Sequence, residues 1–160
     1  MMMNTKRSVT HATFVIERTY DASPERVFKA FSDPKEKAKW FVGPDGWEST
    51  ETTMDFRVGG RETSVGGPKG GFVSAFHSTY QDIVPNERII YAYDMDLDGV
   101  RISVSLGTIE FKPSGKGTRL VLTEMGAYLD GWDKPDQREQ GTRQLLEQLA
   151  RALEPKEKAA

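Results

Sequence analysis

Side chains suited to ligand binding alternate near the middle of the chain. Tyr91, Tyr93 and Met95 are spaced two residues apart, so in an extended strand they point to the same face. Tyrosine offers apolar area and one hydroxyl group, which suits a cavity for an apolar or aromatic molecule. We therefore assign the three residues to the concave side of a sheet. The alternative is that they are ordinary core residues whose hydroxyls reach backbone or water.

One acidic residue shares this inward direction. Glu124 has the same parity as Leu120 and Leu122, so the pattern predicts that it points into the interior near a strand end. A buried carboxylate is unfavourable unless it is paired, and burial raises its pKa. Glu124 is therefore a candidate general acid/base or a polar anchor for a ligand. The alternatives are a solvated position at the rim or a pair with an arginine.

Three aromatic residues flank a turn at Gly43 and Pro44. Trp40, Phe41 and Trp47 surround this turn, whose glycine and proline interrupt regular structure. We expect these rings to close one end of the cavity, either as a gate or as part of the core.

The remaining polar candidates favour structural roles. Asp55 and Arg57 precede Gly59 and Gly60. They form either a ligand-facing pair or a structural pair on the convex side, beside glycines that permit a bend.

The spacing of the histidines does not indicate a metal site. His11 and His77 are far apart, and no second histidine or carboxylate stands at the spacing of a metal motif. We therefore expect no metal site. Separately, no cofactor is expected.

Composition excludes several classes of protein. The chain has 160 residues, no cysteine, 22 basic and 24 acidic residues, so disulfides, thiol nucleophiles and a basic nucleic-acid surface are not expected. No apolar run is long enough for membrane insertion or a signal peptide, which favours the cytoplasm. We expect a single domain over residues 9–154, with flexible termini at 1–8 and 155–160.

Local patterns predict the elements that position these residues. A strand over 11–20 is followed by two short helices, 24–32 and 34–41, each starting with a capping residue and proline. About six strands and turns occupy 47–125. In 100–111, we assign Val104 and Leu106 to the same face as Ile102 and predict a bulge at Gly107.

The carboxy-terminal segment predicts a long amphipathic helix over 135–153. Its apolar stripe has the spacing of one helix face and consists of Thr142, Leu145, Leu146, Leu149 and Leu153. No other predicted element is long enough to cover one face of such an antiparallel sheet. We therefore expect a twisted sheet wrapped around this helix, with Thr142, Leu145 and Leu149 facing the cavity.

Four motifs in order carry a resemblance to a known family. They are ASPERVFKAF at 22–31, WFVGP at 40–44, DFRVGGR at 55–61 and PNERIIY at 85–91. The sequence resembles the Activator of Hsp90 ATPase homologue-like proteins of the START-like (SRPBCC) superfamily. The resemblance implies an α+β helix-grip fold: a curved antiparallel sheet of six or seven strands around a long carboxy-terminal helix, with two short helices after the first strand.

One position departs from the family pattern. Members often carry Gly-Trp near the start of the long helix, where this chain has Gly141 and Thr142. Either the interior is roomier, or Trp132 in the preceding loop fills the space.

The resemblance implies a hydrophobic cavity between sheet and helix, and three functions remain open because fold does not determine function. We favour binding of a small hydrophobic or aromatic ligand. The alternatives are a cyclase- or hydrolase-type enzyme using Glu124 and the tyrosines, and a co-chaperone for an Hsp90-type ATPase. A homodimer is compatible with each, and no nucleic-acid partner is expected.

Overall fold

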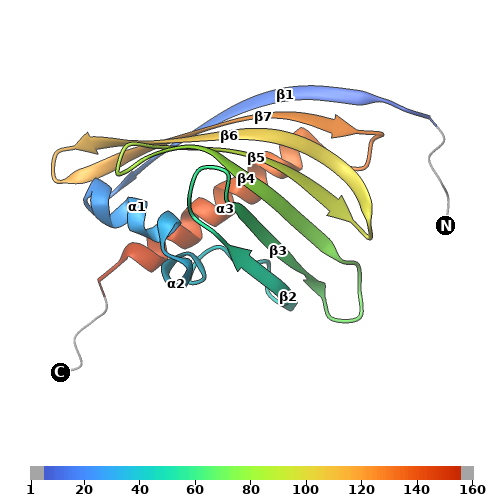
Figure 1. Cartoon of the computed structure of the whole chain (residues 1–160), viewed down its shortest axis with the longest axis horizontal. Helices are drawn as coiled ribbons and strands as arrows, with labels where there is room; N and C mark the ends of the chain where they lie inside the picture. Colours follow the sequence, from blue (N-terminus) through green and yellow to red (C-terminus); the bar gives the residue numbers. More distant parts are fainter. Residues whose placement is uncertain (1–5, 156–160) are drawn as a thin grey trace.

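One seven-stranded antiparallel sheet curves around a single long helix (Figure 1). The computed structural model describes residues 6–155. The strand order is β1-β7-β6-β5-β4-β3-β2. The strands are β1 (Val9–Tyr20), β2 (Trp47–Met54), β3 (Arg61–Pro68), β4 (Ser74–Val84), β5 (Arg88–Leu97), β6 (Val100–Ser114) and β7 (Gly117–Leu129). The predicted helix-grip fold is confirmed.

Three helices lie on the same side of the sheet (Figure 1): α1 (Pro24–Ser32), α2 (Pro34–Lys37) and α3 (Pro135–Leu153). The Ser23 hydroxyl caps α1 by accepting from the Arg26 backbone N–H at 3.2 Å. Asp33 caps α2 in the same way through the Lys35 N–H at 2.9 Å. The predicted bounds of α1 and α3 are confirmed, whereas α2 ends at Lys37 rather than at residue 41.

The core lies at the end of the concave face beneath α1. Phe28 and Phe31 of α1 meet Phe111 of β6 edge to face at 5.4 and 5.5 Å. Leu146 and Leu149 of α3 are fully buried against the same cluster. These contacts attach the helices to the sheet through burial of apolar surface.

The predicted faces of β6 are wrong. Ser103, Ser105 and Gly107 face the interior, whereas Val104 and Leu106 are 46% and 41% exposed on the convex face. The register continues unbroken through Gly107, and the irregularity falls instead at Ile102, which is the extra residue opposite Met95 and Asp96. The apolar alternation misled the prediction because the interior here is polar and contains no large β6 side chains.

The chain ends are only partly described. Residues 1–5 and 156–160 lie outside the described residues, so the expectation of flexible termini is not addressed there. Arg7 and Ser8, which we expected to be flexible, both bond to the Asp130 carboxylate at 2.9 Å. Within residues 6–155, no helix combines the length and apolar character needed to span a membrane.

Candidate functional site

A cavity of about 730 Å³ lies between the concave face and α3. This volume falls within the range typical of small-molecule sites. Nine of the ten predicted site residues line it: Trp40, Phe41, Trp47, Tyr91, Tyr93, Met95, Glu124, Thr142 and Leu145. Leu149 does not; it is fully buried in the core one turn beyond Leu145, and Leu146 lines the cavity instead.

The cavity opens between α3 and the segment that precedes and begins β2. Exposed lining residues stand on both sides of this mouth: Gly43, Pro44, Glu48 and Ser49 on one side, and Gln137, Gly141 and Gln144 on α3. Near one end, the Gln148 amide donates to the Trp40 carbonyl at 2.6 Å. This bond ties the loop after α2 to the long helix.

The three aromatic residues at the mouth differ in their surroundings. Trp40 belongs to the core: it is 3% exposed, and its indole N–H donates to the Ala30 carbonyl at 2.9 Å. Phe41 and Trp47 are half-buried, and Trp47 meets Phe72 edge to face at 5.5 Å. The two expected roles therefore apply to different residues. Trp40 belongs to the core, whereas Phe41 and Trp47 lie at the rim of the cavity.

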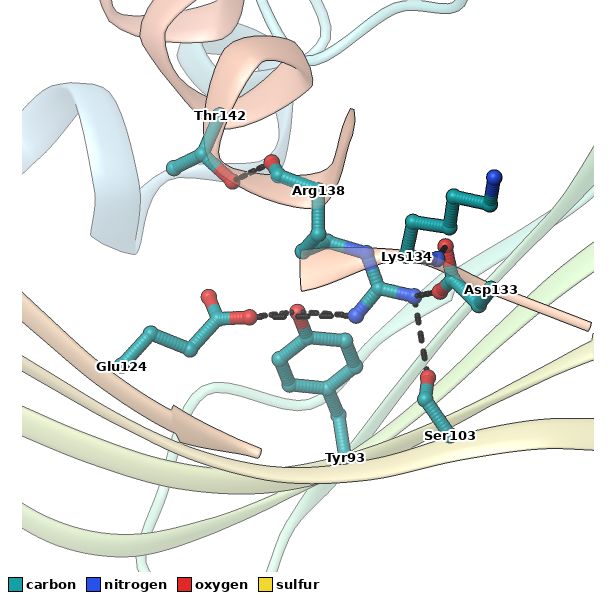
Figure 2. Close-up of polar contacts among 7 residues, drawn as sticks. All are labelled: Tyr93, Ser103, Glu124, Asp133, Lys134, Arg138 and Thr142. Atoms are coloured by element: carbon teal, nitrogen blue, oxygen red, sulfur yellow. Dashed lines mark hydrogen bonds and ion pairs between the residues drawn. The ribbon is translucent and has the colours of Figure 1, made fainter. Parts of the chain in front are cut away.

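Glu124, which lines the cavity, lies at one end of a polar cluster centred on Arg138 (Figure 2). It is 2% exposed, and its Oε1 accepts a short hydrogen bond from the Tyr93 hydroxyl. Arg138 Nη1 lies 3.8 Å from the same Oε1 and donates to the Tyr93 oxygen at 3.0 Å. Both the predicted inward direction and the predicted arginine partner are therefore present.

Burial dominates the electrostatics of this cluster. Removal from water raises the pKa of the Glu124 carboxyl, while the Tyr93 hydrogen bond and the Arg138 charge act in the opposite direction. The pKa of Tyr93 is also raised, by burial and then by the Glu124 charge. Tyr93 therefore stays protonated and acts as the donor to Glu124.

Arg138 is the residue of this cluster that the sequence analysis missed. It stands in the first turn of α3 and donates through Nη2 to the Ser103 hydroxyl at 2.9 Å and to the Asp133 carboxylate. Its side chain is 13% exposed. Because polar residues occupy much of the first half of α3, the stripe of leucines did not reveal that one arginine turns inward.

A second polar cluster, also missed, lies on the opposite wall. Glu62 of β3 is 4% exposed, and its Oε1 accepts from the Tyr80 hydroxyl and, at 2.7 Å, from Lys37 Nζ. Burial, followed by the Glu62 charge, raises the pKa of Tyr80. The three residues are far apart in sequence and meet through β3–β4 pairing and the docking of α2, so spacing alone could not find them.

Tyr91 lies between these two clusters. Its cross-strand neighbour is Gly107, which in turn pairs with Glu124 on β7. A Cβ at Gly107 would stand 2.5 Å from Tyr91 Cζ, so the missing side chain lets the tyrosine ring lie across the sheet. The ring stacks on Tyr93 at 5.7 Å.

Asp55 and Arg57 lie outside the cavity, in the turn after β2 rather than on a strand. Arg57 Nε donates to Asp55 at 2.8 Å, and both side chains are more than half exposed. Gly60 packs against this turn so closely that a Cβ would stand 2.0 Å from the Asp55 carbonyl oxygen. The pair is therefore not part of the cavity lining, and it belongs to a turn and not to the convex face of a strand.

His77 is not isolated, contrary to the sequence expectation. Its side chain shares a small cluster with Asp94 and Asp96, whose ligand atoms all lie within 4.8 Å of one another. Cross-strand pairing of His77 with Asp94 creates the group, which spacing along the chain could not show. His77 and the two aspartates lie away from the cavity lining.

Threonine at position 142, where family members often carry tryptophan, leaves space in the cavity. Thr142 lines the cavity and donates its hydroxyl to the Arg138 carbonyl at 2.9 Å. Trp132 is 37% exposed and absent from the lining. Of the two explanations for the missing family tryptophan, the structure supports the roomier interior.

Comparisons with known proteins agree with this architecture. The family described as Activator of Hsp90 ATPase homolog 1-like protein matches residues 21–154. Solved structures also match: the Mll3558 protein from Rhizobium loti is 49% identical with a TM-score of 0.85, covering 91% of this chain and 99% of its own. A protein from Rhizobium leguminosarum is 44% identical with a TM-score of 0.88, covering 93% and 98%.

A more distant structure, the CV1439 protein from Chromobacterium violaceum, is 33% identical with a TM-score of 0.77, covering 89% of this chain and 97% of its own. No curated protein matches the chain significantly. The family match covers most of the chain and extends from the segment before α1 to the end of α3. The chain therefore belongs to the Activator of Hsp90 ATPase homolog 1-like family, with its START-like fold.

Proposed function

We propose that this chain is a cytoplasmic small-molecule-binding protein that holds a hydrophobic or aromatic ligand between the sheet and α3. The observation that carries the proposal is the cavity of about 730 Å³ with aromatic walls. Protein interiors normally pack closely, with few voids larger than a water molecule. A space of this size beside a well-packed core indicates a site shaped for an occupant.

The arrangement of the walls supports binding over loose packing. Edge-to-face, tilted and stacked contacts connect Phe41, Phe76, Tyr93 and Tyr91 in a continuous row along the cavity. Hydrogen bonds hold the Tyr93 and Tyr80 hydroxyls in place. Such fixed aromatic surfaces suit a flat apolar molecule, because little side-chain freedom is lost on binding.

Native mass spectrometry and a thermal-shift panel test the proposal. The protein purified under mild conditions is examined for co-purifying mass, then melted with lipids and aromatic compounds. A ligand at 100 times its Kd stabilises the fold by about 2.7 kcal/mol, which for a domain of this size raises Tm by roughly 5–10 °C. Absence of a bound species together with no shift for any compound would contradict the proposal.

Glu124 favours one second candidate, an enzyme using acid/base catalysis. A carboxyl that is buried at the cavity wall and has a raised pKa is suited to exchanging a proton with a bound molecule. An enzyme of this kind would lose turnover in Glu124→Gln while the variant still binds the substrate. Chemical conversion of a co-purified ligand by the wild-type protein is the observation that would select this candidate.

A further inference from the structure

We propose that the cavity selects aromatic or apolar molecules carrying a hydrogen-bond donor, with a protonated amine bound most tightly, and that it discriminates against carboxylates of the same shape. This inference rests on the proposed binding function and adds the class of ligand. It follows from the acceptor atoms left free on the cavity walls and from the charges of the lining residues.

The first free acceptor is on Glu124. Its Oε1 is used by Tyr93 and Arg138, whereas Oε2 carries no bond in Figure 2 and has no hydrogen-bond partner among residues 6–155. Some polar atoms without a hydrogen-bond partner are fully enclosed by protein, but Oε2 of Glu124 is not among them. An acceptor that is desolvated on most sides gains strongly from a ligand donor.

The second free acceptor faces the cavity from the opposite wall. Glu62 uses Oε1 for both Tyr80 and Lys37. Its Oε2 has no hydrogen-bond partner within the described part of the chain. Like Oε2 of Glu124, it is not among the polar atoms that are fully enclosed by protein. The two glutamates thus repeat one design, in which a tyrosine and a cation occupy one oxygen and leave the other available.

Tyr91 adds a polar group between the two carboxylates. No described residue forms a hydrogen bond with its hydroxyl, although the residue lines the cavity and stacks on Tyr93. Burial, and then the charge of Glu124, raises its pKa well above the ordinary value. The hydroxyl therefore stays protonated and offers a ligand both a donor and an acceptor.

The charges of the lining work against an anionic ligand. The charged residues of the lining are the acids Glu48, Glu62, Glu124 and Asp133 and the bases Lys37 and Arg138. Both bases are already paired, Lys37 with Glu62 and Arg138 with Asp133 and Glu124. A bound carboxylate would lose water without gaining a free cation, whereas an amine gains a free carboxylate oxygen.

A matched set of indoles tests the inference. Tryptamine, tryptophol, 3-ethylindole and indole-3-propionate are each used at pH 7.5 to displace the neutral fluorophore N-phenyl-1-naphthylamine from the protein. We expect tryptamine to bind at least about tenfold more tightly than indole-3-propionate, with tryptophol between them. Equal or tighter binding of the propionate would overturn the inference.

The same titrations separate this inference from the function on which it depends. If the fluorophore and 3-ethylindole bind but the amine is not preferred, the ligand class is wrong and the binding function stands. If neither the fluorophore nor any indole binds, both the inference and the proposed function fail.

Removing the charge of a glutamate on the cavity wall provides the second test. Glu124→Gln keeps the side-chain shape and removes the charge, so the preference for tryptamine over indole-3-propionate should fall severalfold. Glu110→Gln is the matched control, because Glu110 lies on the outer face of β6 beside Lys112 and its variant should keep the full preference. An undiminished preference in both Glu124→Gln and Glu62→Gln would overturn the inference, with fluorophore binding and a thermal melt reporting that each variant is folded.

Discussion

The concave face of the sheet is solid at one end and hollow at the other. Beneath α1, Phe111 and Leu120 pack with Leu149 of α3 into a closed core in which these side chains are at most 3% exposed. Elsewhere on the same face, Tyr91 and Tyr93 of the neighbouring strand β5 face a cavity of about 730 Å³. One sheet and one helix therefore provide both the stability of the fold and the space for a ligand.

The difference between the two ends lies in their side chains. The solid end consists mainly of aliphatic and phenylalanine side chains, which fill space without directional requirements. The hollow end holds Glu62 and Glu124, whose hydrogen bonds with Tyr80 and Tyr93 fix the positions of the walls. Buried polar groups are costly to separate from their partners, so the walls cannot collapse inward to remove the cavity. The cavity is therefore maintained by the hydrogen bonds of its own wall residues.

The largest contrast is expected between two leucines one turn apart on α3. Leu149→Ala should lower the free energy of unfolding by about 2–5 kcal/mol, because it opens a void in a closed core. Leu145→Ala should cost less than about 1.5 kcal/mol, because Leu145 already borders empty space. Urea denaturation measures both values, and equal losses would show that the two ends do not differ in packing.

A smaller effect is expected from removal of the arginine that joins α3 to the hollow end. Arg138→Met should lower stability by about 1–3 kcal/mol, since it leaves Asp133 and Glu124 without their cation. Arg143→Met is the control, because Arg143 pairs with Glu139 at the surface and should cost less than about 0.5 kcal/mol. Similar losses in the two variants would contradict a structural role for the buried cluster.

The glycine beneath Tyr91 tests how closely the wall is fitted. A Cβ at Gly107 would come within 2.5 Å of the tyrosine ring, so Gly107→Ala must push the ring toward the cavity. We expect weaker fluorophore binding with a stability loss of about 1 kcal/mol. Gly141→Ala, where a Cβ meets nothing within 4 Å, should instead stabilise the helix by roughly 0.5–1 kcal/mol. Unchanged binding in Gly107→Ala would show that the ring position is not important.

The smallest effect is a pH dependence of stability at Glu124. Its folded-state pKa is raised above the ordinary value of 4.5, so the folded protein binds more protons than the unfolded chain in the interval between the two pKa values. The stabilisation is therefore complete below pH 4.5 and is lost as pH rises through the folded-state pKa. Unfolding free energies from pH 4 to 8 should show wild type losing stability relative to Glu124→Gln as pH rises. A constant or increasing difference would contradict the raised pKa.

Local signals predicted the fold well. Proline and capping residues marked the starts of α1 and α2, and the leucine stripe identified the helix that the sheet encloses. Parity with Leu120 and Leu122 placed Glu124 inside. These predictions succeeded because each depends on neighbouring residues or on alternation within one element.

The predictions that failed depend on contacts between elements. Val104 and Leu106 alternate like core residues but lie on the convex face, because the interior beside them is occupied by Tyr91, Tyr93 and their hydrogen-bond partners. Glu62 meets Lys37 and Tyr80 only after strands and helix have paired. Alternation and spacing contain no information about such long-range pairs.

A titration with N-phenyl-1-naphthylamine tests the central claim, that the space beside α3 receives a ligand. Wild-type protein should show saturable binding with one site per chain, and Thr142→Trp should lose it while keeping a cooperative melt, because the new ring enters the cavity that Thr142 lines. Gln140→Trp, on the exposed side of the same helix, should bind like wild type. Equal binding by wild type and Thr142→Trp would show that the fluorophore does not enter this cavity and would contradict the account.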